Sequence, residues 1–127
     1  MPPEIARLWT FLPLGFALSV LIETPVLLVG LSQPHNLARR LFAGVWLTAC
    51  TYPIVILVLP LLIMPTFGHA IYVAVAEIFA PLAECAIFWW AYDRHLQRTS
   101  IARDMAAIII ANLASWLLGG WLVDRLL

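Results

Sequence analysis

The chain has 127 residues, of which 64% are hydrophobic and 11% are charged, and its formal net charge is zero. A soluble domain is nearer half apolar and a quarter charged, so a chain this short has no interior large enough to hide its apolar side chains from water. Lipid is the solvent that this composition fits, and the zero net charge argues against nucleic acid as a partner. We therefore expect a single membrane domain over residues 1–127.

Four apolar runs predict four transmembrane helices, because a helix needs roughly 20 mostly apolar residues to cross a bilayer. They cover about residues 9–30, 41–64, 70–92 and 105–122. The first run is too long for the apolar part of a cleaved signal peptide, and we treat it as a retained helix. No run alternates between apolar and polar residues, which excludes membrane strands. The expected fold is an all-α antiparallel up-down bundle.

The placement of arginines predicts the orientation of this bundle. The connections at 31–40 and 93–104 lie on the same side and hold five arginines, whereas the other side holds Arg7 and Arg125 and the turn at 65–69 holds none. The positive-inside rule places both connections in the cytoplasm and both termini outside. The membrane that we expect is a bacterial inner membrane.

Three glutamates lie within the predicted spans, namely Glu23, Glu77 and Glu84. An ionised carboxylate at the centre of a bilayer costs roughly 2.5–3.5 kcal/mol on insertion scales, and the predicted spans contain no Arg, Lys or His that pairs with it. Each glutamate should therefore be protonated, bound to a cation, exposed to water, or reached by Arg40 or Arg103 from the cytoplasmic edge.

Counting about 1.5 Å per residue from the predicted helix ends places polar side chains of all four helices at similar depths and on consistent faces. The candidate substrate- or ion-binding residues from this layer are Glu23, Thr48, Tyr52, Glu84, Asn112 and Ser115, and Glu77, which lies closer to the outer boundary, is added to them. Interhelical hydrogen bonding is a sufficient explanation for Thr48, Asn112 and Ser115. A buried carboxylate is a costly way to join helices, so Glu23 and Glu84 point more strongly to function.

Other chemistry-bearing residues give no specific motif. His35, His69 and His95 lie in the predicted connections, where they cannot supply two axial haem ligands within the membrane, and we interpret them as solvated loop residues. Cys50 and Cys85 match no metal or redox spacing. No phosphate-binding loop, zinc-protease helix or nucleophile elbow occurs. We expect no metal site and no cofactor, and no catalytic residue can be assigned.

Three functions fit this pattern. The first is a proton- or cation-linked transporter or ion pathway, in which Glu23 and Glu84 exchange a proton or cation along a pathway that forms between the protomers of a homo-oligomer. The second is a non-catalytic accessory subunit of a larger membrane complex, whose carboxylates pair with other membrane subunits. The third is an intramembrane lipid-modifying enzyme with Glu23 and Glu84 as acid and base, which we rank last because no nucleophile or metal set is evident.

Overall fold

The computed structural model describes residues 3–126, and within that range it contains helices and no strand. The elements are α1 (Pro3–Gly30), α2 (Leu37–Pro53), the π-helical turn η1 (Ile54–Val58), α3 (Leu59–Phe88), the π-helical turn η2 (Trp89–Asp93) and α4 (Ile101–Leu126). The prediction of an all-helical fold is confirmed.

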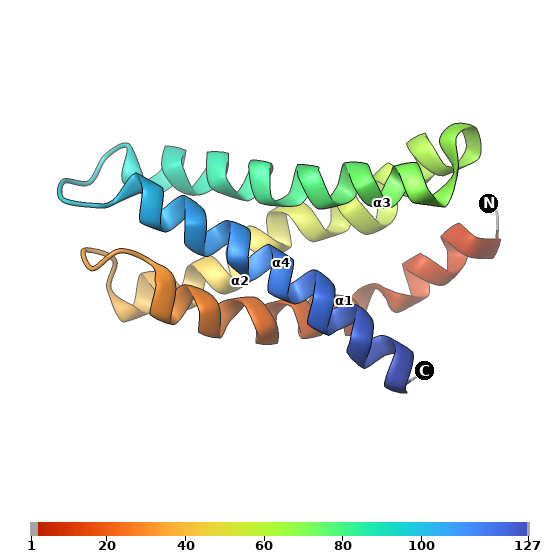
Figure 1. The fold of residues 1–127 in the computed structure, drawn as a ribbon, viewed down its shortest axis with the longest axis horizontal. Helices are drawn as coiled ribbons and strands as arrows, with labels where there is room; N and C mark the ends of the chain where they lie inside the picture. Colours follow the sequence, from red (N-terminus) through yellow and green to blue (C-terminus); the bar gives the residue numbers. More distant parts are fainter. Residues whose placement is uncertain (1–2, 127) are drawn as a thin grey trace.

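Three helical segments of the described chain are long and apolar enough to cross a membrane, whereas four were predicted. They are Leu12–Gly30, Leu37–Asp93 and Ile101–Leu122. The middle segment has 57 residues, and its backbone departs from helical geometry at Gly68, with φ 87° and ψ 177°. Glycine adopts such a conformation without the clash that a Cβ causes. The chain reverses direction there (Figure 1), at the position of the predicted turn.

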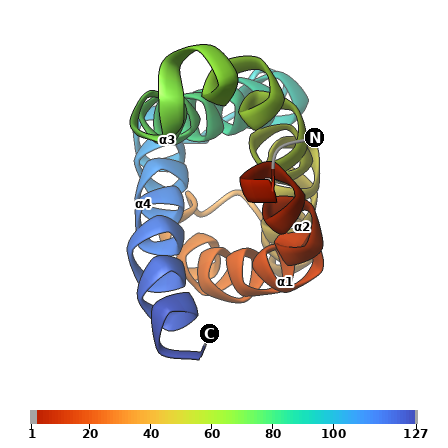
Figure 2. The ribbon, with the colours of Figure 1, turned by 90° about the vertical axis from the view of Figure 1, so that its right-hand side faces the viewer.

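The four helical passes run back and forth along the long axis of the molecule. Figure 1 shows the connections after α1 and before α4 at one end, and the start of α1, the end of α4 and the reversal within α3 at the other end. We call these the connection end and the terminal end. Viewed from the terminal end, α1, α2, α3 and α4 follow one another around a centre (Figure 2), and α1 packs against both α2 and α4.

Two helices begin earlier than predicted because polar caps precede their apolar runs. The side chain of Asn36 accepts a hydrogen bond from the backbone N–H of Arg39 at 2.8 Å, and α2 begins directly after it. The hydroxyl of Ser100 accepts one from the backbone N–H of Arg103 at 3.2 Å, and α4 begins directly after that. Capping oxygens satisfy N–H groups that have no partner within the helix, so each helix extends back to its cap.

The buried apolar core lies towards the connection end. Its members are Leu27, Leu31, Ala43, Leu47, Phe88, Ala107, Ile108 and Ala111. A Cβ on Gly30 would lie 2.9 Å from the Cβ of Ala107, and a Cβ on Gly44 would lie 2.9 Å from the Cβ of Thr24. These glycines therefore let α1 approach α4 and α2 closely, and the connection end is tightly packed.

Large apolar side chains also cover the outside of the bundle. Exposed examples from all four helices are Leu21, Phe42, Leu62, Leu82, Trp90 and Leu117. Soluble monomers rarely expose apolar surface this continuously. The exposed surface is compatible with insertion into lipid, as are the three long apolar segments.

Candidate binding cavity with buried carboxylates

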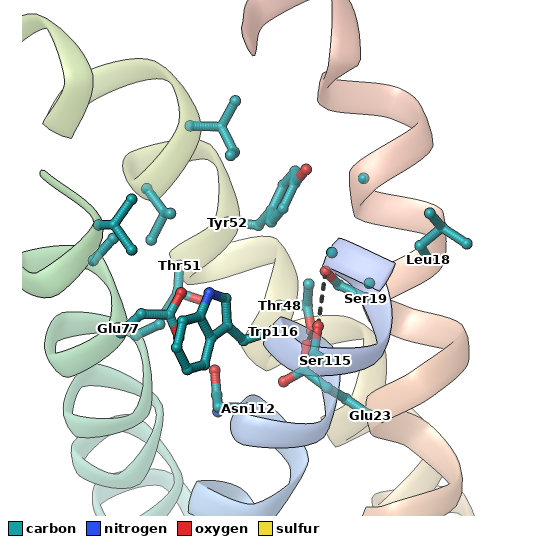
Figure 3. Close-up of a pocket in the computed structure, with 18 of the residues that line it drawn as sticks. Leu18, Ser19, Glu23, Thr48, Thr51, Tyr52, Glu77, Asn112, Ser115 and Trp116 are labelled. Atoms are coloured by element: carbon teal, nitrogen blue, oxygen red, sulfur yellow. Dashed lines mark hydrogen bonds between the residues drawn. The ribbon is translucent and has the colours of Figure 1, made fainter. Parts of the chain in front are cut away.

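A cavity of about 500 Å³ lies inside the bundle, between the apolar core and the terminal end. All the candidate residues predicted from the sequence line it: Glu23, Thr48, Tyr52, Glu77, Glu84, Asn112 and Ser115. Figure 3 shows labelled side chains from all four helices directed into the same space. Polar residues that are far apart in the sequence therefore meet in one place.

The two most deeply buried carboxyl groups of the cavity are those of Glu23 and Glu84, which are 4% and 2% exposed. Each faces a threonine of α2. Oγ1 of Thr48 lies 3.4 Å from Oε2 of Glu23, and Oγ1 of Thr51 lies 3.4 Å from Oε2 of Glu84. Both hydroxyl groups also lie 3.1 Å from a backbone carbonyl oxygen of their own helix. Each hydroxyl proton is therefore shared, which leaves the carboxyl groups weakly satisfied.

The expectation that Arg40 or Arg103 reaches these glutamates is wrong. The guanidinium group of Arg40 donates to three carbonyl oxygens between Leu28 and His35, at 2.6, 2.7 and 3.0 Å. Arg103 donates to the carbonyl oxygen of Gly30 at 2.9 Å. The last carbonyl groups of a helix have no partner within it, so Arg103 and one N–H of Arg40 satisfy the C-terminal end of α1, and the other donors of Arg40 hold the connection that follows.

Polar groups of α4 form one wall of the cavity. The side-chain amide of Asn112 donates to the carbonyl oxygen of Ile108 at 2.9 Å, which leaves its own carbonyl oxygen free to accept. The hydroxyl of Ser115 donates to that of Ser19 at 3.2 Å and joins α4 to α1, as the dashed line in Figure 3 marks.

Two tyrosines of the cavity differ in how the protein uses their hydroxyl groups. The hydroxyl of Tyr72 donates to the carbonyl oxygen of Val55 at 2.7 Å. The hydroxyl of Tyr52 is buried and has no hydrogen-bond partner among the described residues. A buried hydroxyl without a partner costs free energy, so Tyr52 offers a hydrogen bond to whatever enters the cavity.

The cavity reaches the surface at the terminal end. His69, next to the reversal at Gly68, is exposed and lines it. Glu77 is half-buried and lies on α3 between His69 and the deeper Glu84. A solute entering from the terminal end would therefore pass Glu77 before it reaches Glu84.

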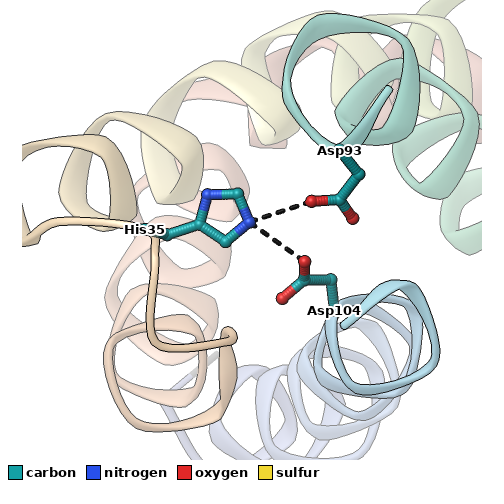
Figure 4. Close-up of side chains that lie close together, drawn as sticks. All are labelled: His35, Asp93 and Asp104. Atoms are coloured by element: carbon teal, nitrogen blue, oxygen red, sulfur yellow. Dashed lines mark hydrogen bonds and ion pairs between the residues drawn. The ribbon is translucent and has the colours of Figure 1, made fainter. Parts of the chain in front are cut away.

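The connection end is closed by a buried cluster of His35, Asp93 and Asp104, which are 1%, 5% and 0% exposed. Nε2 of His35 lies 2.9 Å from Oδ1 of Asp93 and 3.0 Å from Oδ2 of Asp104 (Figure 4). The interpretation of His35 as a solvated loop residue is therefore wrong. His95 is exposed in the connection before α4, whereas His69 lies within α3 and, although exposed, lines the cavity.

Asp104 also fixes the first connection to α4. One of its oxygens accepts a hydrogen bond from the backbone N–H of Ser32 at 2.6 Å, and the other accepts one from the hydroxyl of Ser32 at 3.0 Å. Sequence reasoning missed this cluster because its members come from three separate segments with no motif spacing. The available sign was that His35, Asp93 and Asp104 all lie in the two connections that are predicted to be on the same side, 31–40 and 93–104.

The fold and the cavity define an all-helical chain with three membrane-compatible segments and a carboxylate-lined interior. Comparison with known proteins finds no matching family model, no matching curated protein and no matching solved structure. The geometry of the cavity is therefore what bears on function.

Proposed function

We propose that the chain is a small proton- or cation-linked transporter or ion pathway that binds a proton or cation at Glu23 and Glu84. One observation carries the proposal: an internal cavity of about 500 Å³ holds two buried carboxyl groups, and none of the described residues that line it is an arginine or a lysine. A buried charge is normally paired, and intramembrane carboxyl groups commonly belong to ion pathways and proton relays.

The proposal includes four membrane crossings with both termini outside. At about 1.5 Å per residue, the 57-residue middle segment would be roughly 85 Å long if straight. The hydrocarbon layer is about 30 Å thick, so the segment fits only if it crosses twice. The reversal at Gly68 supports this reading, because it divides the segment into two passes.

The surroundings of the carboxyl groups support binding of a cation or proton. Oxygen atoms of Thr48, Thr51 and Asn112 line the same space as Glu23 and Glu84. Hard cations prefer oxygen ligands of this kind, and a neutral carboxyl group forms hydrogen bonds with the same partners. The site therefore accepts either occupant, which is what exchange of a proton for a cation requires.

Passage through the protein requires the connection end to open, since the core and the cluster of His35, Asp93 and Asp104 close it. We propose that the helices rearrange around the cavity, with assembly into a homo-oligomer or with other membrane subunits supporting that movement. The same carboxyl groups would be loaded from one side and released to the other.

The test is proton movement across a membrane that contains only this chain. Purified protein is reconstituted into liposomes that enclose the pH-sensitive dye pyranine, and a potassium diffusion potential or a sodium gradient is imposed. We expect wild-type protein to give proton flux above that of empty liposomes, and Glu84→Gln to abolish it while the protein remains folded. Glu77→Gln, which changes a half-buried carboxyl group, is the matched control and should retain part of the flux.

Two other outcomes would contradict the proposal. If wild-type liposomes conduct no better than empty ones and the chain co-purifies with other membrane proteins, an accessory subunit is the better explanation. If Glu84→Gln dissociates the bundle, the carboxylate was charged and paired, and Glu84 is not a titrating site.

A further inference from the structure

The cluster at the connection end has fewer hydrogen-bond donors than its carboxylates need. The four oxygens of Asp93 and Asp104 are offered the backbone N–H and hydroxyl of Ser32 and one N–H of His35. The Ser32 donors both go to Asp104. The proton on Nε2 of His35 therefore has to serve two carboxylates at 2.9 and 3.0 Å.

One oxygen of this cluster is left without any partner. Oδ2 of Asp93 is buried and accepts no hydrogen bond from the described residues. Water does not compensate for this at the surface, because the side chains of His35 and Asp93 are both 0% exposed. Figure 4 shows this oxygen on the side of Asp93 that faces Asp104. Two adjacent buried carboxylates with an unpartnered oxygen lack positive charge, and a cation supplies it.

We propose that His35, Asp93 and Asp104 bind one divalent transition-metal ion, of the class of Zn²⁺, at the connection end. Their ligand atoms all lie within 4.8 Å of one another. One imidazole and two carboxylates form a donor set that suits Zn²⁺, whereas Mg²⁺ and Ca²⁺ prefer oxygen ligands alone. Two carboxylates and one divalent ion sum to zero charge, which removes the cost of burying the aspartates.

Metal binding requires small, defined changes in the cluster. Metal–ligand bonds of about 2.0–2.2 Å place neighbouring ligand atoms further apart than hydrogen-bonded ones, so the two aspartates would move slightly away from His35. Nε2 must present its lone pair, and the proton then lies on Nδ1. Arg39, whose guanidinium lies 3.3 Å from Nδ1, would turn away. Its half-buried position over the ring of Tyr92 leaves room for that movement.

The proposed ion would join segments that the backbone leaves separate. His35 lies in the connection between α1 and α2, Asp93 lies at the end of η2, and Asp104 lies in the first turn of α4. A single ion would therefore fix both connections to each other. The inference does not depend on the proposed transport function, because the cavity lies towards the opposite end.

The test uses the full chain, purified in detergent without a histidine tag and stripped with a chelator. Zn²⁺ and Co²⁺ are added back, and we measure bound metal per chain, the visible absorption of Co²⁺ and the Tm. Wild-type protein should bind about one ion per chain, gain the visible bands of Co²⁺ in a low-symmetry N/O site, and show a higher Tm. Binding should weaken as the pH falls, because the ligands must lose their protons.

Asp93→Asn is the decisive variant, because Asp93, unlike Asp104, accepts no hydrogen bond from Ser32 and the substitution keeps its shape. We expect it to lower metal affinity tenfold or more and to abolish the Co²⁺ bands, with its helical content unchanged. The double variant His69→Ala/His95→Ala is the matched control. It removes the exposed histidines, which bind Zn²⁺ adventitiously, and should retain the tight site.

Several results would overturn the inference. Absence of Co²⁺ bands from the stripped wild type, loss of binding in the double histidine variant, or equal binding by Asp93→Asn would each do so. The cluster would then be a set of hydrogen bonds in which His35 and the two aspartates share a proton and hold the connections together. If Asp93→Asn does not fold, X-ray absorption of Zn²⁺-loaded wild type decides the question, since the inference requires one imidazole and oxygen ligands around the ion.

Discussion

At the scale of single residues, some polar side chains of the cavity form hydrogen bonds within the protein, and others have hydrogen-bonding groups without a partner among the described residues. The hydroxyl of Tyr72 donates a hydrogen bond to the carbonyl oxygen of Val55. The hydroxyl of Tyr52 has no hydrogen-bond partner among the described residues. The two residues are of the same type and line the same cavity, so they form a natural pair for separating stability from binding.

We predict that Tyr52→Phe leaves stability unchanged or slightly improved, because no intramolecular hydrogen bond is lost. Tyr72→Phe should destabilise the fold by about 1 kcal/mol, the usual net contribution of such a bond. Unfolding of the purified variants by denaturant in detergent measures both. On the proposed function, Tyr52→Phe should nevertheless reduce proton flux. A larger loss of stability in Tyr52→Phe than in Tyr72→Phe would contradict this division.

The sequence was sufficient to find the residues of the cavity and insufficient to find those of the closed end. Glu23, Glu84 and Asn112 stand out because a polar residue within a long apolar run has few explanations. His35 and Asp104 lie in polar segments, where such residues are ordinary, and only the folded chain brings them together. The roles of Arg40 and Arg103 were misjudged for a related reason: unsatisfied backbone carbonyls compete with carboxylates for arginine, and a sequence does not display them.

At the scale of elements, close packing depends on small residues at particular positions. Gly44 of α2 lies against Thr24 of α1, where an added Cβ would be 2.9 Å from the Cβ and 3.1 Å from the Cα of Thr24. Gly119 of α4 has nothing within 4 Å of an added Cβ. The small residues of α4 therefore differ in their surroundings: Ala107 packs against Gly30, whereas Gly119 borders the cavity.

We predict that Gly44→Ala destabilises the bundle by about 1–3 kcal/mol, since overpacking at a helix contact forces the backbones apart. Gly119→Ala is the matched control and should leave stability equal or raise it by roughly 0.5–1 kcal/mol, because alanine is the better helix former. Thermal unfolding in detergent compares the two. Equal destabilisation by both substitutions would show that the contact between α1 and α2 is looser than described.

Hydropathy located the elements but not their ends. The apolar runs gave the positions of the helices, because a run of that length has no alternative in lipid. The hydropathy pattern predicts that α2 starts at about residue 41 and α4 at about residue 105. The caps at Asn36 and Ser100 begin these helices earlier. Asn36 and Ser100 are cap-forming residue types, but the hydropathy pattern alone assigns such polar residues to the connections.

At the scale of the whole molecule, the two ends of the bundle have opposite characters. The connection end carries the apolar core and the arginines Arg39, Arg40, Arg94, Arg98 and Arg103, whereas the terminal end carries the mouth of the cavity. In the proposed orientation, which follows the positive-inside rule, the arginine-rich end faces the cytoplasm. The cavity would then open to the outside in this conformation.

This orientation predicts which engineered cysteines an impermeant maleimide reaches in intact cells. The background carries Cys50→Ala and Cys85→Ala, which remove the free cysteines. Thr66→Cys, exposed beside the reversal, should be labelled from outside. Gln97→Cys, exposed in the connection before α4, should be labelled only after the membrane is permeabilised. Both sites are solvent-facing within the fold, so a difference between them reports the membrane and not burial. Labelling of Gln97→Cys in intact cells, with Thr66→Cys protected, would reverse the orientation and turn the mouth of the cavity towards the cytoplasm.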